Sequence, residues 1–177
     1  AIPQGFRLPV LYNSSGYEAV GTLRLLQDVV DIYLPDAKYA DDAVARRISG
    51  FRRYVHFNRE ALREMYRQVG SRLDLDGDGL AVRGMIVRHL VLPGGLAQSA
   101  RVARWLAENL SPDLHVSIMS QYFPAHRAVG DPVLGRKITE EEYAAAVDAF
   151  VDAGLVNGWQ QEYDEDETIS YQSSAIS

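Results

Sequence analysis

The sequence predicts an α/β protein in which a mainly parallel sheet of about four strand-helix units forms a partial (β/α) barrel. Nearly continuous apolar runs alternate with segments of helical periodicity, as in parallel strands whose outer face is covered by helices. A closed eightfold barrel takes about 250 residues, whereas this chain has 177. We therefore expect one domain over 1–177 that is either an open sheet or part of a barrel.

Apolar runs and helix signals place the elements in order. The expected strands lie at 8–13, 29–35, 84–95 and 114–120. The expected helices run from Ser15 to Leu26, over about 41–49, from Asn58 to Gly70, over about 99–110, and from Thr139 to Gly154.

Capping signals indicate where two of these helices begin. Ser15 with Glu18, and Thr139 with Glu142, have the spacing of a capping box, in which a hydroxyl and a carboxylate three residues later satisfy the first helical amides. Both pairs stand directly before helical segments, so each is predicted to fix the start of its helix.

A third helix start is indicated at Asn58, where Phe57 and Leu62 are spaced as a hydrophobic staple. At the other end of the chain, the segment 158–172 contains two β-leaning runs around an acidic turn. The region 8–154 is thus expected to form the barrel part, and the tail 155–177 to include a β-hairpin.

Composition excludes several classes of function. A net charge of −6 argues against a nucleic-acid partner, because such proteins usually carry a basic face. No run approaches the roughly 18 apolar residues of a membrane span, and no charged and then apolar leader is visible, so a cytoplasmic protein with no membrane partner is expected. The absence of cysteine excludes disulfides, thiolate catalysis and any iron-sulfur cluster held by this chain's own sulfurs.

The strand at 29–35 ends at Pro35 and is followed by an acid and a base, Asp36 and Lys38. Residues two apart in an extended segment point to the same side, and ligand sites of parallel sheets lie at the carboxyl ends of the strands. The two charges are therefore predicted to face one ligand together. A turn at Pro35 with a solvated lysine is the alternative.

Arg88 and His89 interrupt the longest apolar run, so alternation directs one toward the barrel interior and the other toward the covering helices. Arg88 is either a fixed cation for a carboxylate ligand or part of a buried ion pair. His89 is predicted to be a hydrogen-bonded core histidine, and His126 to lie at the surface.

The segment "DLDGDG" at 74–79 matches the opening of a calcium loop, with Asp74, Asp76 and Asp78 as oxygen ligands. The twelfth position, which needs a bidentate glutamate, is Met85, and a strand rather than a helix is predicted to follow. A solvated acidic loop is the favoured interpretation, and calcium binding is the alternative.

Four segments, in this order and spacing, carry a resemblance to a known family: "LPVLYNSSGYE", "VDIYLPDAKY", "VRGMIVRHLVLPGG" and "SIMSQYFPAH". Over residues 8–154 they resemble the later two-thirds of the radical S-adenosylmethionine proteins related to pyruvate formate-lyase activating enzyme. The resemblance implies a partial barrel in which a [4Fe-4S] cluster, held by C-x3-C-x2-C on an early loop, cleaves S-adenosylmethionine. The radical so formed takes hydrogen from a small molecule, or from a protein or peptide partner.

The resemblance also implies roles for strand-end residues. The residues implied to bind the cofactor are Asn13, Ser14, Asp36, Lys38, Arg88, Gln121 and Tyr122. Lys38 matches a lysine that holds S-adenosylmethionine, and Asp36 an aspartate beside a monovalent cation. Asn13 and Ser14 stand where the family has Asp-Thr at that cation, so one negative charge is missing. Near Tyr122 the family places a histidine that contacts the cofactor, whereas the neighbouring residues here are Gln121 and Phe123.

The lack of cysteine departs from the family at the point where its chemistry begins. The first barrel strands are also missing, so the chain alone is predicted not to cleave S-adenosylmethionine, and its first strand is left as an edge through which it could associate. The alternative is a non-catalytic α/β module that binds an anionic metabolite or calcium.

Overall fold

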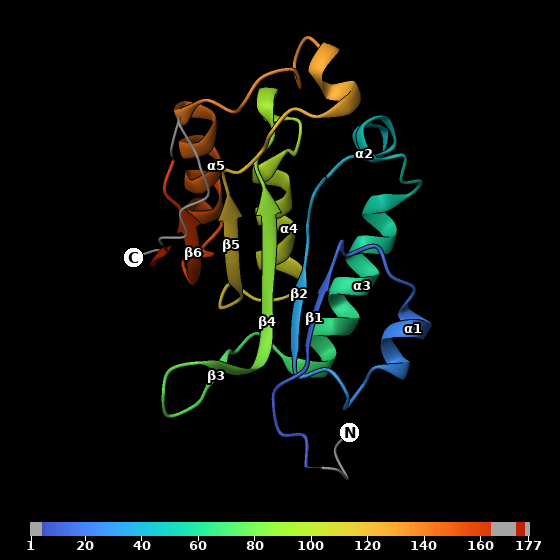
Figure 1. Cartoon of the computed structure of the whole chain (residues 1–177), viewed down its shortest axis with the longest axis vertical. Helices are drawn as coiled ribbons and strands as arrows, with labels where there is room; N and C mark the ends of the chain where they lie inside the picture. The colour runs from blue at the N-terminus through green and yellow to red at the C-terminus, as the bar shows by residue number, and fades with distance from the viewer. Residues whose placement is uncertain (1–4, 164–172, 176–177) are drawn as a thin grey trace.

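The computed structural model describes residues 5–163 and 173–175, and its centre is a mostly parallel sheet. The parallel strands are β1 (Leu11–Ser14), β2 (Ile32–Pro35), β4 (Ala81–Leu90), β5 (His115–Met119) and β6 (Gly158–Gln161). They lie side by side in the order β1-β2-β4-β5-β6, with antiparallel β7 (Ser173–Ala175) beyond β6 (Figure 1). The predicted α/β class and parallel sheet are confirmed.

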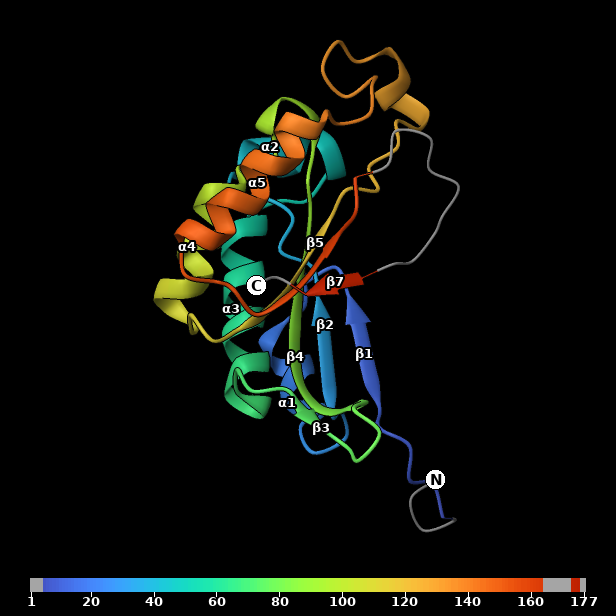
Figure 2. The same cartoon turned by 90° about the vertical axis from the view of Figure 1, so that its left-hand side faces the viewer.

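The helices all cover one face of this sheet (Figure 2). They are α1 (Val20–Leu25), α2 (Asp42–Ser49), α3 (Tyr54–Val69), α4 (Ser99–Asn109) and α5 (Glu140–Asp152). Because the strand order never reverses, right-handed crossovers place every helix on the same side, as in a barrel and unlike a doubly wound sheet. The core fills the space between the helices and the sheet, with Leu62, Met85 and Phe150 fully buried.

Within 5–163, no α-helix covers the opposite face of the sheet. Side chains alternate along β4 and β5, so Val87, His89 and Ile118 are buried toward the helices while Arg88 and Met119 lie on the helix-free face and are only partly covered. The sheet is open, since its order ends at β1 on one side and β7 on the other within the described residues. β1 is an edge strand, as predicted.

Two helix starts differ from the prediction. α1 begins at Val20 with Ala19 as its N-cap, so the capping box of Ser15 and Glu18 does not form. α3 begins at Tyr54, one turn before Asn58, because aromatic packing around Tyr54 extends the helix toward its start. The box at α5 is confirmed, with Thr139 accepting from the amide of Glu142 and Glu142 accepting from the amide of Thr139.

The acidic segment at 74–79 and the tail also add strand pairs. β3 (Asp74–Leu75) pairs antiparallel with β4, which makes 74–90 a hairpin that periodicity alone did not reveal. The first β-leaning run of the tail is β6, a full member of the parallel sheet, and its antiparallel partner is β7. The second predicted run, up to 172, lies outside the described residues. The longest described helix, α3, has 16 residues, and none of the described helices is long and apolar enough to cross a membrane.

Candidate functional site

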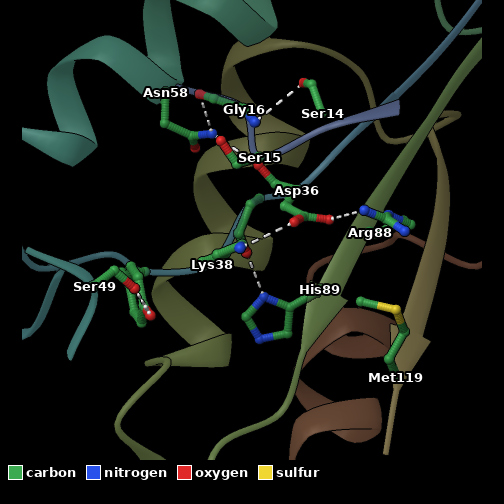
Figure 3. Close-up of polar contacts among 12 residues, drawn as sticks. Ser14, Ser15, Gly16, Asp36, Lys38, Ser49, Asn58, Arg88, His89 and Met119 are labelled. Carbon is green, nitrogen blue, oxygen red and sulfur yellow. Dashed lines mark hydrogen bonds and ion pairs between the residues drawn. The ribbon is translucent and has the colours of Figure 1, made fainter. Parts of the chain in front are cut away.

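Asp36, Lys38 and Arg88 meet at the carboxyl ends of β2 and β4 (Figure 3). The Asp36 carboxylate lies 2.6 Å from Nη2 of Arg88 through Oδ1 and 3.3 Å from Nζ of Lys38 through Oδ2. Its side chain is 11% exposed, whereas those of Arg88 and Lys38 are 24% and 31% exposed. The predicted common orientation of Asp36 and Lys38 is confirmed, and one buried carboxylate is shared by two cations.

Backbone pairing fixes these side chains in place. The amide of Asp36 donates to the carbonyl of Ser14 at 3.0 Å, and the amide of Ala37 donates to the carbonyl of Arg88 at 2.8 Å. Asp36 also forms a parallel bridge with Arg88 beyond the end of β2. The ends of β1, β2 and β4 are thus joined where the charges are, and polar groups at the ends of parallel strands are brought to one edge of the sheet.

Two residues of α3, Asn58 and Tyr54, hydrogen-bond to the backbone of the site. The sequence did not predict either of them as a site residue. Nδ2 of Asn58 donates to the carbonyls of Asp36 and Gly16, at 2.8 and 2.9 Å. The hydroxyl of Tyr54 accepts from the amide of Lys38 at 3.0 Å. The signal for Asn58 was available, because it is a polar residue on the buried stripe of a helix, three and four residues before Ala61 and Leu62.

Glu18 is a second residue that sequence reasoning placed elsewhere. Glu18 does not cap α1. Its side chain lies near Ser14 and Asp36, and its Oε2 atom is buried without a hydrogen-bond partner. Burial raises the pKa of the Glu18 carboxyl, with a smaller rise from the charge of Asp36, while a hydrogen bond with Ser14 acts in the opposite direction. No local sequence signal could have distinguished this position from a capping glutamate.

Buried polar atoms without hydrogen-bond partners concentrate at this site. Among the described residues they belong to Glu18 (Oε2), Asp36 (Oδ1) and Arg88 (Nε). Asp36 Oδ1 nevertheless lies 2.6 Å from Nη2 of Arg88, so the contact is a close ion pair whose alignment is not that of a hydrogen bond. Because buried polar groups are normally satisfied, the spare donors and acceptors point to a ligand at this edge.

His89 faces the other way, into the helix layer. Its Nδ1 lies 2.7 Å from the carbonyl of Ala37, and its Nε2 lies 2.9 Å from Oγ of Ser99. A carbonyl only accepts, so Nδ1 carries the proton and Nε2 accepts from the serine. Burial lowers the pKa of His89 to about 4. The predictions of a core histidine here, and of a surface position for His126, are confirmed.

The remaining predicted residues divide between the site edge and a loop. Ser14 lies at the edge, where its Oγ accepts from the amide of Gly16 at 3.2 Å, and Asn13 is exposed on the end of β1. Gln121 is exposed in the loop after β5, and the hydroxyl of Tyr122 donates to the carbonyl of Leu134 at 2.9 Å. That hydroxyl is therefore engaged within the loop, and a cofactor role for Gln121 and Tyr122 stays a prediction.

The acids of the proposed calcium loop serve the hairpin turn. Oδ1 of Asp76 accepts from the amides of Asp78 and Leu80, at 3.0 and 2.9 Å, and Asp74 pairs with Arg72 at 3.2 Å. No three acidic, histidine or cysteine side chains converge as metal ligands in 5–163. This geometry supports the interpretation of a turn made by an acidic loop.

Comparison with known proteins adds one relative. No protein-family model matches the chain. The chain is 29% identical over 144 residues to an uncharacterized protein of Methanocaldococcus jannaschii, a match that covers 80% of this chain and 37% of that protein. This chain thus spans just over a third of the length of the relative it matches, and the relative brings no activity with it.

Proposed function

We propose that this chain is the later part of a radical S-adenosylmethionine enzyme of the activating-enzyme-like kind and that its strand-end site holds S-adenosylmethionine. The observation that supports this most is the pairing of two cations, Lys38 and Arg88, with the single buried carboxylate of Asp36 at the carboxyl ends of parallel strands. Such a site has a cation to spare for a ligand carboxylate.

The chemical groups of S-adenosylmethionine fit the donors and acceptors that are present. Its amino-acid carboxylate suits Lys38 and the free Nε of Arg88, and its ammonium or ribose hydroxyl groups suit the buried Oε2 of Glu18. The cofactor supplies, on reductive cleavage, the radical that removes hydrogen from a substrate. The residues of this chain hold and orient the cofactor. The backbone hydrogen bonds between the ends of β1, β2 and β4 keep the charged side chains in position before the ligand binds.

The iron-sulfur cluster does not fit this chain. There is no cysteine in the sequence, and in the described part of the chain no three potential ligands converge. The cluster, and with it the reducing electron, belongs in this proposal to another part of a longer protein. The 177 residues alone are therefore expected to bind S-adenosylmethionine without cleaving it.

Calorimetric titration of the chain with S-adenosylmethionine tests the binding role. We expect saturable binding that Lys38→Met weakens about tenfold, as expected for the loss of one charge-assisted contact. Arg104→Met is the matched control and leaves affinity unchanged, since Arg104 is an exposed arginine of α4 that forms no ion pair with any residue the structure describes. S-adenosylhomocysteine, which lacks the sulfonium charge, measures how much that charge contributes. If S-adenosylmethionine shows no saturable binding to this chain, the proposed cofactor site is wrong.

The reading frame upstream of Ala1 tests the other half of the proposal. A frame that continues into C-x3-C-x2-C supports it, and a start codon at that point contradicts it. In that case the second candidate, a non-catalytic module for a small carboxylate-bearing metabolite, accounts for the same charges, and titration with amino acids that lack the adenosyl group identifies it.

A further inference from the structure

A hollow lies at the carboxyl end of the sheet, between the end of α2 and the loop that follows β5. Its volume is about 790 Å³, within the range of about 300–1,000 Å³ that is usual for small-molecule sites. The residues that give it its chemistry are Arg47, Ile48, Tyr122, Phe123, His126 and Arg127. None of the ion-paired residues of the strand-end site lines it.

The wall of this hollow is held in place by Asp131. Its Oδ1 accepts from the amides of Val133 and Leu134, both at 2.9 Å, and its Oδ2 lies 2.7 Å from Nη2 of Arg47. The backbone hydrogen bonds, with the Arg47 side chain, lower the pKa of Asp131 to about 2, so this carboxylate stays charged. Arg47 is therefore fixed at the rim with donors to spare, and the hydrogen bond from Tyr122 to Leu134 ties down the facing loop.

The charge of the hollow is opposite to that of the whole chain. Of the described residues that line it, Asp131 is the only acid, and it is already neutralised by Arg47. His126 and Arg127 make no hydrogen bond or ion pair within the described part of the chain. His126 also has a φ of 50°, in the left-handed region that non-glycine residues rarely adopt. Strain of this kind persists where surrounding structure imposes it and is concentrated at functional sites.

An apolar surface lies beside Arg127 in the same hollow. Phe123 is 70% exposed, which is unusual for a large aromatic side chain, and Ile48 and Tyr122 line the same hollow. An aromatic ring next to an unpaired arginine suits a ligand that has a flat apolar part and an anionic group. Two arginines line the hollow, and a guanidinium group can pair with a phosphate group through two donors, so a phosphate monoester suits this site.

We propose that this hollow is a binding site for an organic phosphate, with the phosphate on Arg127 and Arg47 and the flat part of the ligand on Phe123. This site is separate from the one that holds the charges of Asp36, and the proposal does not depend on S-adenosylmethionine. The hollow lies at the carboxyl ends of the strands, which is where (β/α) barrels bind their ligands.

Phenyl phosphate, titrated into the 177-residue chain by calorimetry, is the probe. We expect saturable binding that is tighter than that of inorganic phosphate. Arg127→Gln weakens the binding of both probes about tenfold, because it removes one charge-assisted contact. Phe123→Ser reduces the affinity for phenyl phosphate to that for inorganic phosphate. Arg104→Gln on α4 removes the same charge elsewhere and leaves both affinities unchanged.

Melting temperatures equal to that of the parent chain show that each variant is folded, as expected for exposed side chains. The proposal is overturned if phenyl phosphate shows no saturable binding at millimolar concentration. It is equally overturned if Arg127→Gln and Arg104→Gln weaken binding to the same extent, because the attraction would then come from overall charge and not from the hollow.

Discussion

The side chain of Asn58 holds the backbone of Asp36, because its Nδ2 donates to the carbonyl oxygen of Asp36 at 2.8 Å from within the buried layer. The same nitrogen donates to the carbonyl of Gly16 at 2.9 Å. One amide of α3 thus joins the loop after β1 to the residue that carries the central carboxylate of the site.

We expect Asn58→Ala to destabilise the protein by roughly 2–4 kcal/mol, because it removes the short hydrogen bonds to two buried carbonyls and leaves only the longer contact of the Tyr54 hydroxyl to Asp36, at 3.4 Å. Urea denaturation followed by circular dichroism measures the change. Asn109→Ala is the control, because Asn109 is exposed and its side chain hydrogen-bonds to Arg63 and to the carbonyl of Trp105 at the surface. The cost of this substitution is expected to stay below about 1 kcal/mol. Equal losses for the two variants would show that Asn58 does not support the site.

Gly16 is required where the loop after β1 passes over Asp36. Its φ is 69°, and a Cβ at this position would collide with the carbonyl oxygen of Asp36 and with Nδ2 of Asn58. Gly16→Ala is therefore expected to cost roughly 2–4 kcal/mol, from left-handed strain and from the displaced contact.

Gly21→Ala is the matched control for this substitution. Gly21 lies in α1 with open space around its Cβ position, so alanine there is expected to stabilise the helix by up to about 1 kcal/mol. Thermal melts of the two variants should move in opposite directions. If Gly16→Ala melts with the parent chain, the loop is free to move away from Asp36, and the support described for the site is wrong.

Glu18 is expected to lower stability at neutral pH. The folded protein raises the pKa of this carboxyl above its ordinary value of 4.5, so the folded state binds the proton more tightly than the unfolded chain. Stability from this group therefore falls as the pH rises from about 4.5 through the raised pKa.

Glu18→Gln removes this dependence. At pH 7 we expect the variant to melt up to roughly 2–4 °C higher, which corresponds to about 1 kcal/mol at most after allowance for solvent screening. Below pH 4 the two proteins should converge. Glu108→Gln, an exposed glutamate of α4, is expected to change neither value. A Glu18→Gln variant that is less stable at pH 7 would mean that the hydrogen bond with Ser14 outweighs the cost of burying the carboxylate.

The strand-end charges could be predicted because the rules that place them are geometric. Alternation gives Asp36 and Lys38 one direction and separates Arg88 from His89, and parallel strands bring their carboxyl ends together. Glu18 escaped prediction because a serine three residues before it mimics a helix cap. The conformation that turns Glu18 toward Asp36 comes from tertiary contacts of the loop, which no local pattern records.

The hairpin of β3 and β4 and the role of Asn58 have different explanations. β3 contains two residues, too few for a period of two to be visible. Asparagine favours helix caps, so the sequence predicts a helix start at Asn58. The aromatic contacts of Tyr54 instead begin the helix four residues earlier. A polar residue on a buried helical stripe is the pattern that predicts such a support, since its burial requires partners.

His89 is expected to make the protein sensitive to mild acid. It is fully buried and neutral, bonded to Ala37 and Ser99, and its pKa is lowered from 6.5 to about 4 by burial. The unfolded chain takes up this proton near pH 6.5, so between pH 6.5 and 4 it binds more protons than the folded protein, and stability falls as the pH is lowered. The loss from this group approaches roughly 3 kcal/mol at pH 4.

Urea denaturation at a series of pH values from 7 to 4 measures this slope. His89→Gln keeps a donor for the carbonyl of Ala37 but does not titrate, so it is expected to be less stable at pH 7 and to lose less stability on acidification. His126→Gln, an exposed histidine, should retain the slope of the parent chain. Three carboxyl groups have pKa values lowered to about 2, those of Glu64, Glu142 and Asp131. Their contributions to folding stability are therefore lost mainly below pH 4.5. The difference between the parent chain and His89→Gln above pH 4.5 therefore isolates the histidine, and parallel slopes there would contradict its burial as a neutral base.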